Sequence, residues 1–229
     1  MLIRMLTSGN PLWLVIIQFV MLVLALIIVL PIHECAHAWV AYRMGDESQK
    51  AQGRMTLNPL KHLDPIGAVC LLLTGFGWAK PVYVNSALFR RGGKYAGMWV
   101  SLAGPASNLI VGFIFCGLTA GFFALTDGMK IHSEFQYYAL ETVAAFLMIV
   151  FEISVNLAVV NLIPVPPFDG YGILSPFLPD KVRYFIARYQ RFITLGLLVL
   201  LVTNTLSLPI GAVSGWIQKL MKAVFGVQW

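Results

Sequence analysis

Two histidines and a glutamate form a short motif that could hold a metal ion and use it. In His33-Glu34-Cys35-Ala36-His37 the two histidines are four residues apart. On a helix this spacing puts both imidazoles on one face, where they can bind one Zn²⁺. Glu34 lies beside them and could take a proton from a water at the metal. The motif predicts a hydrolytic site with one Zn²⁺ per chain, His33 and His37 as ligands and Glu34 as catalytic base.

The motif follows a long apolar segment in a chain with the composition of a membrane protein. Residues 12–30 contain one polar side chain, Gln18. The 229 residues are 59% hydrophobic and 11% charged, whereas soluble domains have roughly 25% charged residues. The expected fold is an all-α polytopic membrane protein. The net charge of +6 is expected to reflect orientation and contact with the lipid bilayer, not binding of nucleic acid.

Apolar runs and helix-breaking residues predict a bundle of about five helical segments in one membrane-embedded domain, residues 1–229. Gly45 is a natural stop for the first segment, and Pro209 suits the first turn of the last, which either spans or lies on the surface. The expected bounds are about 12–44, 95–125, 137–163, 192–206 with a few flanking residues, and 209–226. The catalytic core is expected at about 12–170 and the C-terminal helices at about 190–228.

Between the first two segments lies a basic region that contains a short apolar stretch. Residues 66–78 are apolar but too few to span comfortably, and Gly75 and Gly77 interrupt them. Residues 81–84 favour a strand. The region is therefore predicted to form a re-entrant β-hairpin or loop.

The distribution of basic residues predicts how the chain is oriented. Residues 46–94 and 164–191 are rich in Lys and Arg, whereas residues 126–136 have Lys130 against two carboxylates. The two basic loops should face the cytoplasm, which puts the N-terminus outside. The histidine pair and Asp169, more than 130 residues apart, then reach the same depth near the cytoplasmic side.

Asp169 is for this reason the expected third metal ligand, with a fourth position left open for water. It follows a proline-rich run and precedes Gly170, which is expected to let the backbone bend sharply. Glu152 competes for this role, but it lies about three turns deeper, where pairing with Asn156 or protonation is expected.

The other histidines and the cysteines carry no comparable signal. His62 is on the same side as the motif, and His132 is on the opposite side, but neither has ligand spacing. The three cysteines are isolated and predict no disulfide framework.

Taken together, the motifs resemble those of the site-2 protease family, the intramembrane zinc metalloproteases. His33-Glu34-x-x-His37 looks like the metal-binding helix of that family. Residues 161–170 look like its second motif, with Phe168 where the family usually has Leu. Residues 104–108 are similar to its Gly-Pro-x-x-Asn, and residues 75–77 to the Gly-x-Gly of its re-entrant loop. Residues 57–65 look like the corresponding segment in the short bacterial branch of the family, whose members lack PDZ and CBS domains.

The resemblance implies that this chain is a multi-pass protein of the bacterial cell membrane. It also implies that the chain cleaves single-span transmembrane proteins in or near the bilayer. It implies that Asn161 helps to hold the substrate or the oxyanion, and that the re-entrant strand holds the substrate extended. The expected substrate-side residues are Asn161, Asn108, Gly75, Phe76 and Gly77. Nothing in the sequence indicates an oligomeric state.

Two other functions stay open at this point. The chain could be a membrane zincin of another type, with Glu152 or Glu141 as the third ligand. It could also be a non-proteolytic metal-binding membrane protein, although the presence of Glu34 favours an enzyme.

Overall fold

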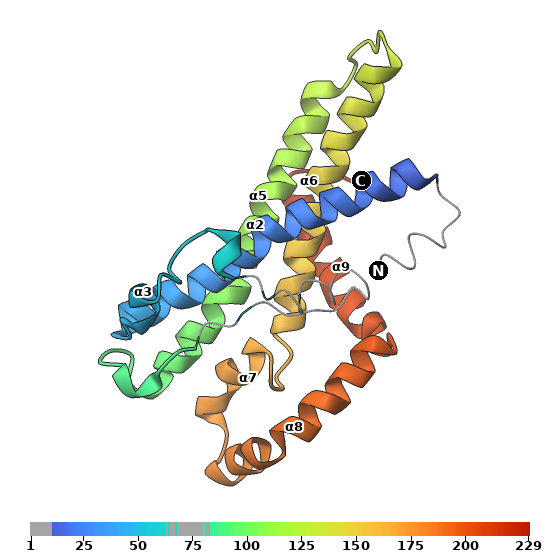
Figure 1. The fold of residues 1–229 in the computed structure, drawn as a ribbon. Helices are drawn as coiled ribbons and strands as arrows, with labels where there is room; N and C mark the ends of the chain where they lie inside the picture. Colours follow the sequence, from blue (N-terminus) through green and yellow to red (C-terminus); the bar gives the residue numbers. More distant parts are fainter. Residues whose placement is uncertain (1–10, 63, 65–66, 68–79, 81–82) are drawn as a thin grey trace.

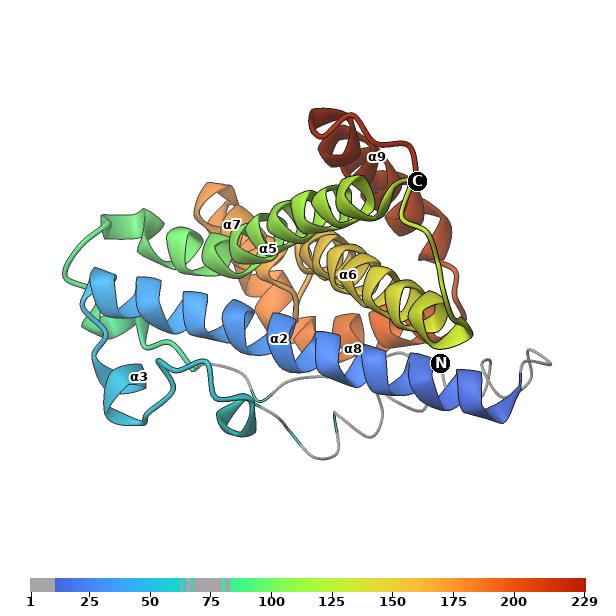
Figure 2. The ribbon, with the colours of Figure 1, turned by 90° about the horizontal axis from the view of Figure 1, so that it is seen from above.

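Three long helices form the centre of the molecule (Figure 1). The computed structural model describes residues 11–62, 64, 67, 80 and 83–229. The central helices are α2 (Leu12–Met44), α5 (Ala96–Thr126) and α6 (Glu134–Asn161). A short loop joins α5 to α6, which run side by side in opposite directions, and α2 lies across them (Figures 1 and 2).

Four helices of the described residues are long and apolar enough to cross a membrane: α2, α5 with the turn before it, α6 and α8 (Asp180–Val202). The chain is thus an integral membrane protein built from helices, as the composition predicts. The fourth helix begins at Asp180 and not near residue 192, so the expected start was wrong. No Gly or Pro interrupts residues 180–195, and the helix therefore includes the basic stretch before its apolar part.

Small side chains allow the central helices to approach closely. Ala25 and Val29 of α2 are completely buried against Val111 and Val150 of the other two helices. At Gly112 of α5, a Cβ atom would come within 3.0 Å of the side chain of Val155. The lipid around membrane helices is as apolar as their side chains, so there is no hydrophobic driving force between the helices. Close packing of this kind holds them together instead.

The last two helices differ in how they attach to this bundle. The final helix, α9 (Ser207–Val224), packs Ile217 and neighbouring apolar residues against Phe151 and Val155 of α6. It is not one of the four candidate spans. In α8 the one buried residue is Leu197, and the remaining apolar side chains are at least partly exposed, as expected of a surface that faces lipid.

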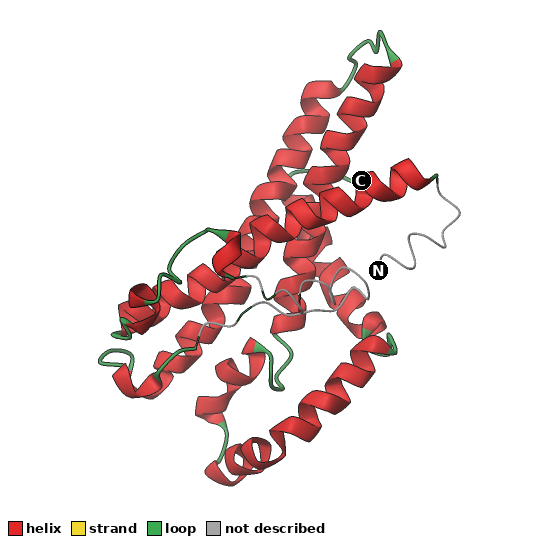
Figure 3. Cartoon of the chain, viewed as in Figure 1, coloured by secondary structure: helices red, strands yellow, loops and turns green. Residues whose placement is uncertain are grey.

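Short helical turns connect the long helices. They are α3 (Ser48–Ala51), η1 (Pro59–Lys61), η2 (Ser86–Leu88), η3 (Gly93–Tyr95), α7 (Asp169–Leu174) and η4 (Ser175–Phe177). Figure 3 shows no strand in the part of the chain that the structure describes. The predicted re-entrant hairpin, with Gly75, Phe76 and Gly77, lies outside the described residues except at its margins.

A buried carboxylate fixes the end of α2. The helix stops at Gly45, which has a φ of +116° and so confirms the predicted glycine stop. The next residue, Asp46, is fully buried and accepts backbone N–H groups of Ser48 at 2.9 Å and Asn85 at 2.8 Å. Burial would raise the pKa of the Asp46 carboxyl, but the Ser48 side chain and these two backbone hydrogen bonds outweigh it and hold the pKa below its ordinary value.

We expect Asp46→Asn to lower the free energy of unfolding at neutral pH by about 1–3 kcal/mol, because the charge that strengthens both hydrogen bonds is lost. The native pKa lies below that of the unfolded chain. The stabilisation is therefore present above the unfolded carboxyl pKa of about 3.9 and is lost as the pH falls through the native value.

Thermal unfolding in one detergent, from about pH 7 down to pH 3, measures this difference between wild type and Asp46→Asn. The matched control is Glu47→Gln, a change at the exposed neighbouring carboxylate. Equal destabilisation by the two variants, or a gap that widens in acid, would contradict the role given to Asp46.

Candidate metal centre

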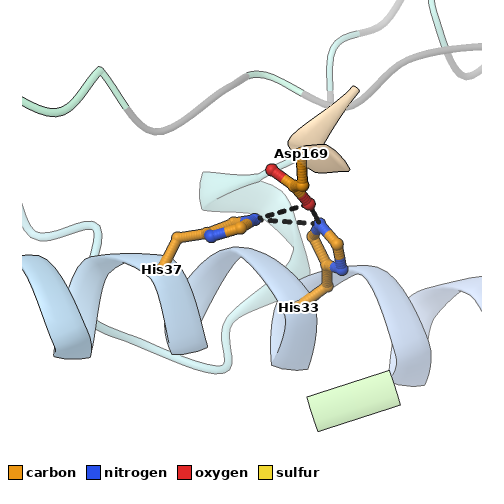
Figure 4. A group of neighbouring side chains, drawn as sticks. All are labelled: His33, His37 and Asp169. Atoms are coloured by element: carbon orange, nitrogen blue, oxygen red, sulfur yellow. Dashed lines mark hydrogen bonds and ion pairs between the residues drawn. The ribbon is translucent and has the colours of Figure 1, made fainter. Parts of the chain in front are cut away.

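The two histidines of the motif lie one turn apart near the end of α2. His33 is 5% exposed and His37 8% exposed, and both side chains point to the same side of the helix (Figure 4). Helix α2 continues through Pro31 without a break, so the spacing of the two rings is the ordinary i, i+4 spacing of a helix. Glu34, half-buried, follows His33 on the same helix.

Asp169 reaches the two histidines from the first residue of α7 (Figure 4). Two glycines allow α7 to lie where it does. A Cβ atom on Gly170 would come within 2.2 Å of the carbonyl oxygen of Leu162, at the end of α6, and one on Gly172 within 2.0 Å of Oγ of Ser101 on α5. Gly170 does not have a positive φ, so the predicted sharp bend was wrong. A glycine is needed there for space.

The three candidate ligand atoms form a small triangle. Nε2 of His33 and Nε2 of His37 are 3.0 Å apart, and Oδ2 of Asp169 lies 3.3 Å from each of them. Bonds of about 2.0–2.1 Å in a tetrahedral zinc site put neighbouring ligand atoms about 3.3 Å apart. The triangle therefore fits three corners of a zinc tetrahedron, and no further His, Cys, Asp or Glu among the described residues joins the group.

Helix α5 supports the far side of both imidazoles with three residues spaced by four. The carbonyl oxygen of Val100 lies 2.7 Å from Nδ1 of His37, and the side-chain amide of Asn108 lies 3.0 Å from Nδ1 of His33. Between them, Gly104 lies so close that a Cβ atom would come within 2.4 Å of His37 Nε2 and 2.5 Å of His33 Cε1. The two helices thus meet at the metal centre itself.

These contacts select the imidazole form that binds metal. A carbonyl oxygen only accepts, so Nδ1 of His37 donates to Val100 and leaves a lone pair on Nε2. At His33 the atom that lies 3.0 Å from Nδ1 is the amide nitrogen of Asn108, and the buried amide oxygen has no partner among the described residues. Turning the amide over puts its oxygen at Nδ1, and His33 then also donates from Nδ1 and leaves a lone pair on Nε2. Two lone pairs and a carboxylate then converge on one point, an arrangement that a bound cation stabilises.

The carboxyl of Asp169 is held in its ionised form. Burial would raise its pKa, but when the imidazoles of His33 and His37 carry protons on Nε2 they donate to Oδ2 across 3.3 Å, which outweighs burial and holds the pKa below its ordinary value. Asp169 is therefore an anionic ligand at neutral pH, which suits a divalent cation.

The remaining candidates lie away from the triangle. Among the described residues, the group that could hold a metal consists of His33, His37 and Asp169. Glu152 and Asn156 are exposed on α6. His62 is buried, with Nε2 2.8 Å from the carbonyl oxygen of Thr56, and His132 is exposed in the loop before α6.

The predicted substrate-side residues have different surroundings. Asn161 ends α6, is half-buried, and donates its amide N–H to the carbonyl oxygen of Leu157 at 2.9 Å. Asn108 is fully buried and contacts a candidate ligand. Its predicted contact with substrate stays a prediction. The sequence does not indicate its contact with His33, or the contacts of Val100 and Gly104 with the rings, because the four-residue spacing on α5 matches that of the histidines without giving the register between the two helices.

Comparisons with known proteins also indicate a zinc site. The sequence model of "Peptidase family M50" matches residues 21–203. A protein of Bacillus subtilis (strain 168) described as "Putative zinc metalloprotease YwhC" is 40% identical over 220 residues, which cover 89% of this chain and 92% of that protein.

Two mycobacterial proteins described as "Putative zinc metalloprotease Rip2" are also similar. The one from Mycolicibacterium smegmatis is 32% identical and the one from Mycobacterium tuberculosis (strain ATCC 25618 / H37Rv) 30% identical, each over 195 residues. In both cases the match covers 82% of this chain and 69% of the relative. No solved structure matches the chain significantly.

We expect Gly104→Ala to abolish stable zinc binding, because the added methyl group would displace both imidazoles from the triangle. Zinc per protein, measured by atomic emission after purification, should fall from about one towards zero. The matched control is Gly121→Ala on the same helix, where a Cβ atom would meet nothing within 4 Å. A Gly104→Ala protein with full zinc content would contradict the close contact.

We expect Asn108→Leu to weaken zinc binding roughly 10–100-fold without removing a ligand, because His33 loses the group that fixes its tautomer. Competition with a chelator of known affinity measures the change. Asn108→Asp keeps an acceptor at this position and should lose less. An affinity equal to that of wild type in Asn108→Leu would show that the amide does not support the ring.

Proposed function

The chain belongs to peptidase family M50 and is a zinc metalloprotease, and from this premise we propose that it is an intramembrane endopeptidase. It hydrolyses peptide bonds of transmembrane-helix substrates in or near the bilayer. One observation carries this proposal: the candidate ligands belong to an apolar spanning helix. Helix α2 has 33 residues, more than the ~20 that span a bilayer, and the buried histidines lie in its C-terminal half.

Each residue of the centre has a distinct task in this reaction. His33, His37 and Asp169 hold the ion. When bound, zinc polarises the carbonyl of the scissile bond and activates a water. Glu34 accepts the proton of that water and delivers it to the leaving nitrogen. Val100 and Asn108 keep the two rings in the orientation that binding requires.

The proposed setting is a bacterial cell membrane with the site near its cytoplasmic side and the N-terminus outside. The support comes from charge: Arg43, Lys50 and Arg54 follow the metal motif closely, whereas the loop between α5 and α6 holds one basic residue, Lys130, besides His132. Basic residues near the ends of spans favour the cytoplasmic side.

The proposed substrates are single-span membrane proteins. A peptide bond within a helix has its carbonyl occupied by the helical hydrogen bond, so the substrate must unwind locally before cleavage. Asn161 and the Gly75-Phe76-Gly77 segment are proposed to hold the unwound chain, as the family resemblance implies. Peptide binding by edge pairing uses backbone groups and suits substrates of varied sequence.

The two other functions have less support. A membrane zincin with a later glutamate as third ligand would need Glu152 or Glu141 beside the histidines. Neither belongs to the metal-competent group of the described residues. A non-proteolytic metal-binding protein would not need Glu34 next to the ligands.

The proposal is tested with purified protein and a single-span substrate in lipid vesicles. We expect Glu34→Gln to keep its zinc and to cleave roughly 10²–10⁴-fold more slowly, which is the usual contribution of a general base. We expect Asp169→Ala to lose both zinc and activity. Zinc content and fragment masses are measured on the same samples.

Three outcomes would contradict this assignment. Equal cleavage by wild type and Glu34→Gln would eliminate the proposed base. Full zinc retention by Asp169→Ala would point to a glutamate ligand such as Glu152. Zinc-loaded wild type that cleaves no membrane-embedded substrate, while it cleaves a soluble peptide, would place the reaction outside the bilayer.

A further inference from the structure

An apolar groove lies between α2 and α5, just beyond the metal centre along both helices. Its volume is about 390 Å³, within the range of roughly 300–1,000 Å³ that is typical of small-molecule sites. Its walls include the indoles of Trp39 on α2 and Trp99 on α5, 52% and 48% exposed. Its lining also includes Ala103 and Ala106 of α5, whose small side chains leave the space open. We call it the α2–α5 groove.

The helix ends and the two indoles indicate that the groove lies where a membrane would meet water. Met44, which lines it, is the last residue of α2, and Trp99 is in the first turn of α5. Tryptophan side chains gather at this level of a bilayer because the ring is apolar and its N–H is polar. An occupant of the groove therefore has its apolar part beside the helices and its polar part at the surface.

Positive charge lies at the end of the groove near Met44. Arg43 lines it and lies over the ring of Trp39, 5.5 Å from the ring centre. The backbone N–H groups of Arg90 and Arg91 donate to the carbonyl oxygen of Met44, at 2.9 and 3.1 Å, which anchors both residues at the same place. All three arginines are exposed, and none forms an ion pair with another described residue.

The carboxylates near this end leave the positive charge in excess. Asp46 is buried, and its two oxygens accept backbone N–H groups. Glu47 is exposed beyond the turn at Gly45. Three exposed arginines against one exposed carboxylate attract an anion at this surface.

We propose that the α2–α5 groove is a binding site for an anionic phospholipid. One acyl chain lies between the two indoles, over Ala103 and Ala106, and the headgroup phosphate lies among the arginines. A planar guanidinium pairs well with a phosphate, and each basic residue near an anionic headgroup strengthens binding severalfold. This site is independent of the proteolytic activity, although Ala103 directly precedes Gly104, which contacts His37.

The test measures quenching of tryptophan fluorescence by lipids with brominated acyl chains, added to zinc-loaded protein in detergent. Phosphatidylglycerol and phosphatidylcholine carry the same brominated chains, so they differ in headgroup charge alone. In wild type we expect the anionic lipid to bind at least fivefold more tightly. We expect Trp39→Phe combined with Trp99→Phe to remove the difference in quenching between the two lipids, because the other exposed tryptophans of the described residues, Trp13 and Trp216, lie outside the groove.

Two variants with matched controls separate the headgroup from the chain. We expect Arg43→Gln to weaken binding of the anionic lipid about fivefold and to leave the other lipid unchanged. Lys130→Gln makes the same charge change in the loop between α5 and α6 and should have no effect. We expect Ala106→Leu to fill the groove and reduce quenching by both lipids, whereas Ala124→Leu, at an exposed position of α5, should not.

Several results would overturn the proposal. Equal affinity of wild type for the two lipids would remove the role of the arginines, and it is also the result expected if the groove takes an apolar peptide helix. A difference in quenching between the two lipids that survives the double tryptophan change would put the anionic lipid elsewhere. The comparison of lipids in wild type depends on no substitution, so it decides the matter even if a variant fails to fold.

Discussion

The contact of α5 with the two imidazoles is the constraint on which the rest of the structure depends. At Gly104 the backbone of α5 is so close to His33 and His37 that only a hydrogen atom fits between them. This proximity brings Val100 and Asn108 to the nitrogens that do not face the metal. Glycine in a membrane helix usually allows two backbones to approach each other, whereas here it allows a backbone to support metal ligands.

Two further glycines, which leave room for close contacts, position the carboxylate of Asp169. Helix α7 rests on α6 at Gly170 and on α5 at Gly172, so the place of Asp169 is set by two helices of the bundle. With neither a cation nor a proton between them, a carboxylate facing two buried imidazole lone pairs would be unfavourable. The packed helices hold these groups together regardless, and rigid support of this kind is what a precise metal site requires.

How much of this was predictable depends on whether a feature belongs to one helix or to two. The pairing of His33 with His37 and the stop at Gly45 follow from the geometry of a single helix, so spacing and residue type indicate them. The meeting with Asp169 could be inferred from the count of spans and the charges of the loops. The support given by Gly104 and Asn108 depends on the register between α2 and α5, which the pattern of neither helix contains.

Helix α8 is attached to the protein far more loosely than its neighbours. It buries one of its 23 residues, Leu197, whereas its first half carries exposed aromatic and basic side chains such as Tyr184 and Arg188. The tilt of a helix with few protein contacts is governed by these interfacial anchors and by hydrophobic mismatch with the surrounding lipid. The thickness of the host bilayer therefore affects the shape of this molecule. A change in acyl-chain length would first alter the tilt of α8.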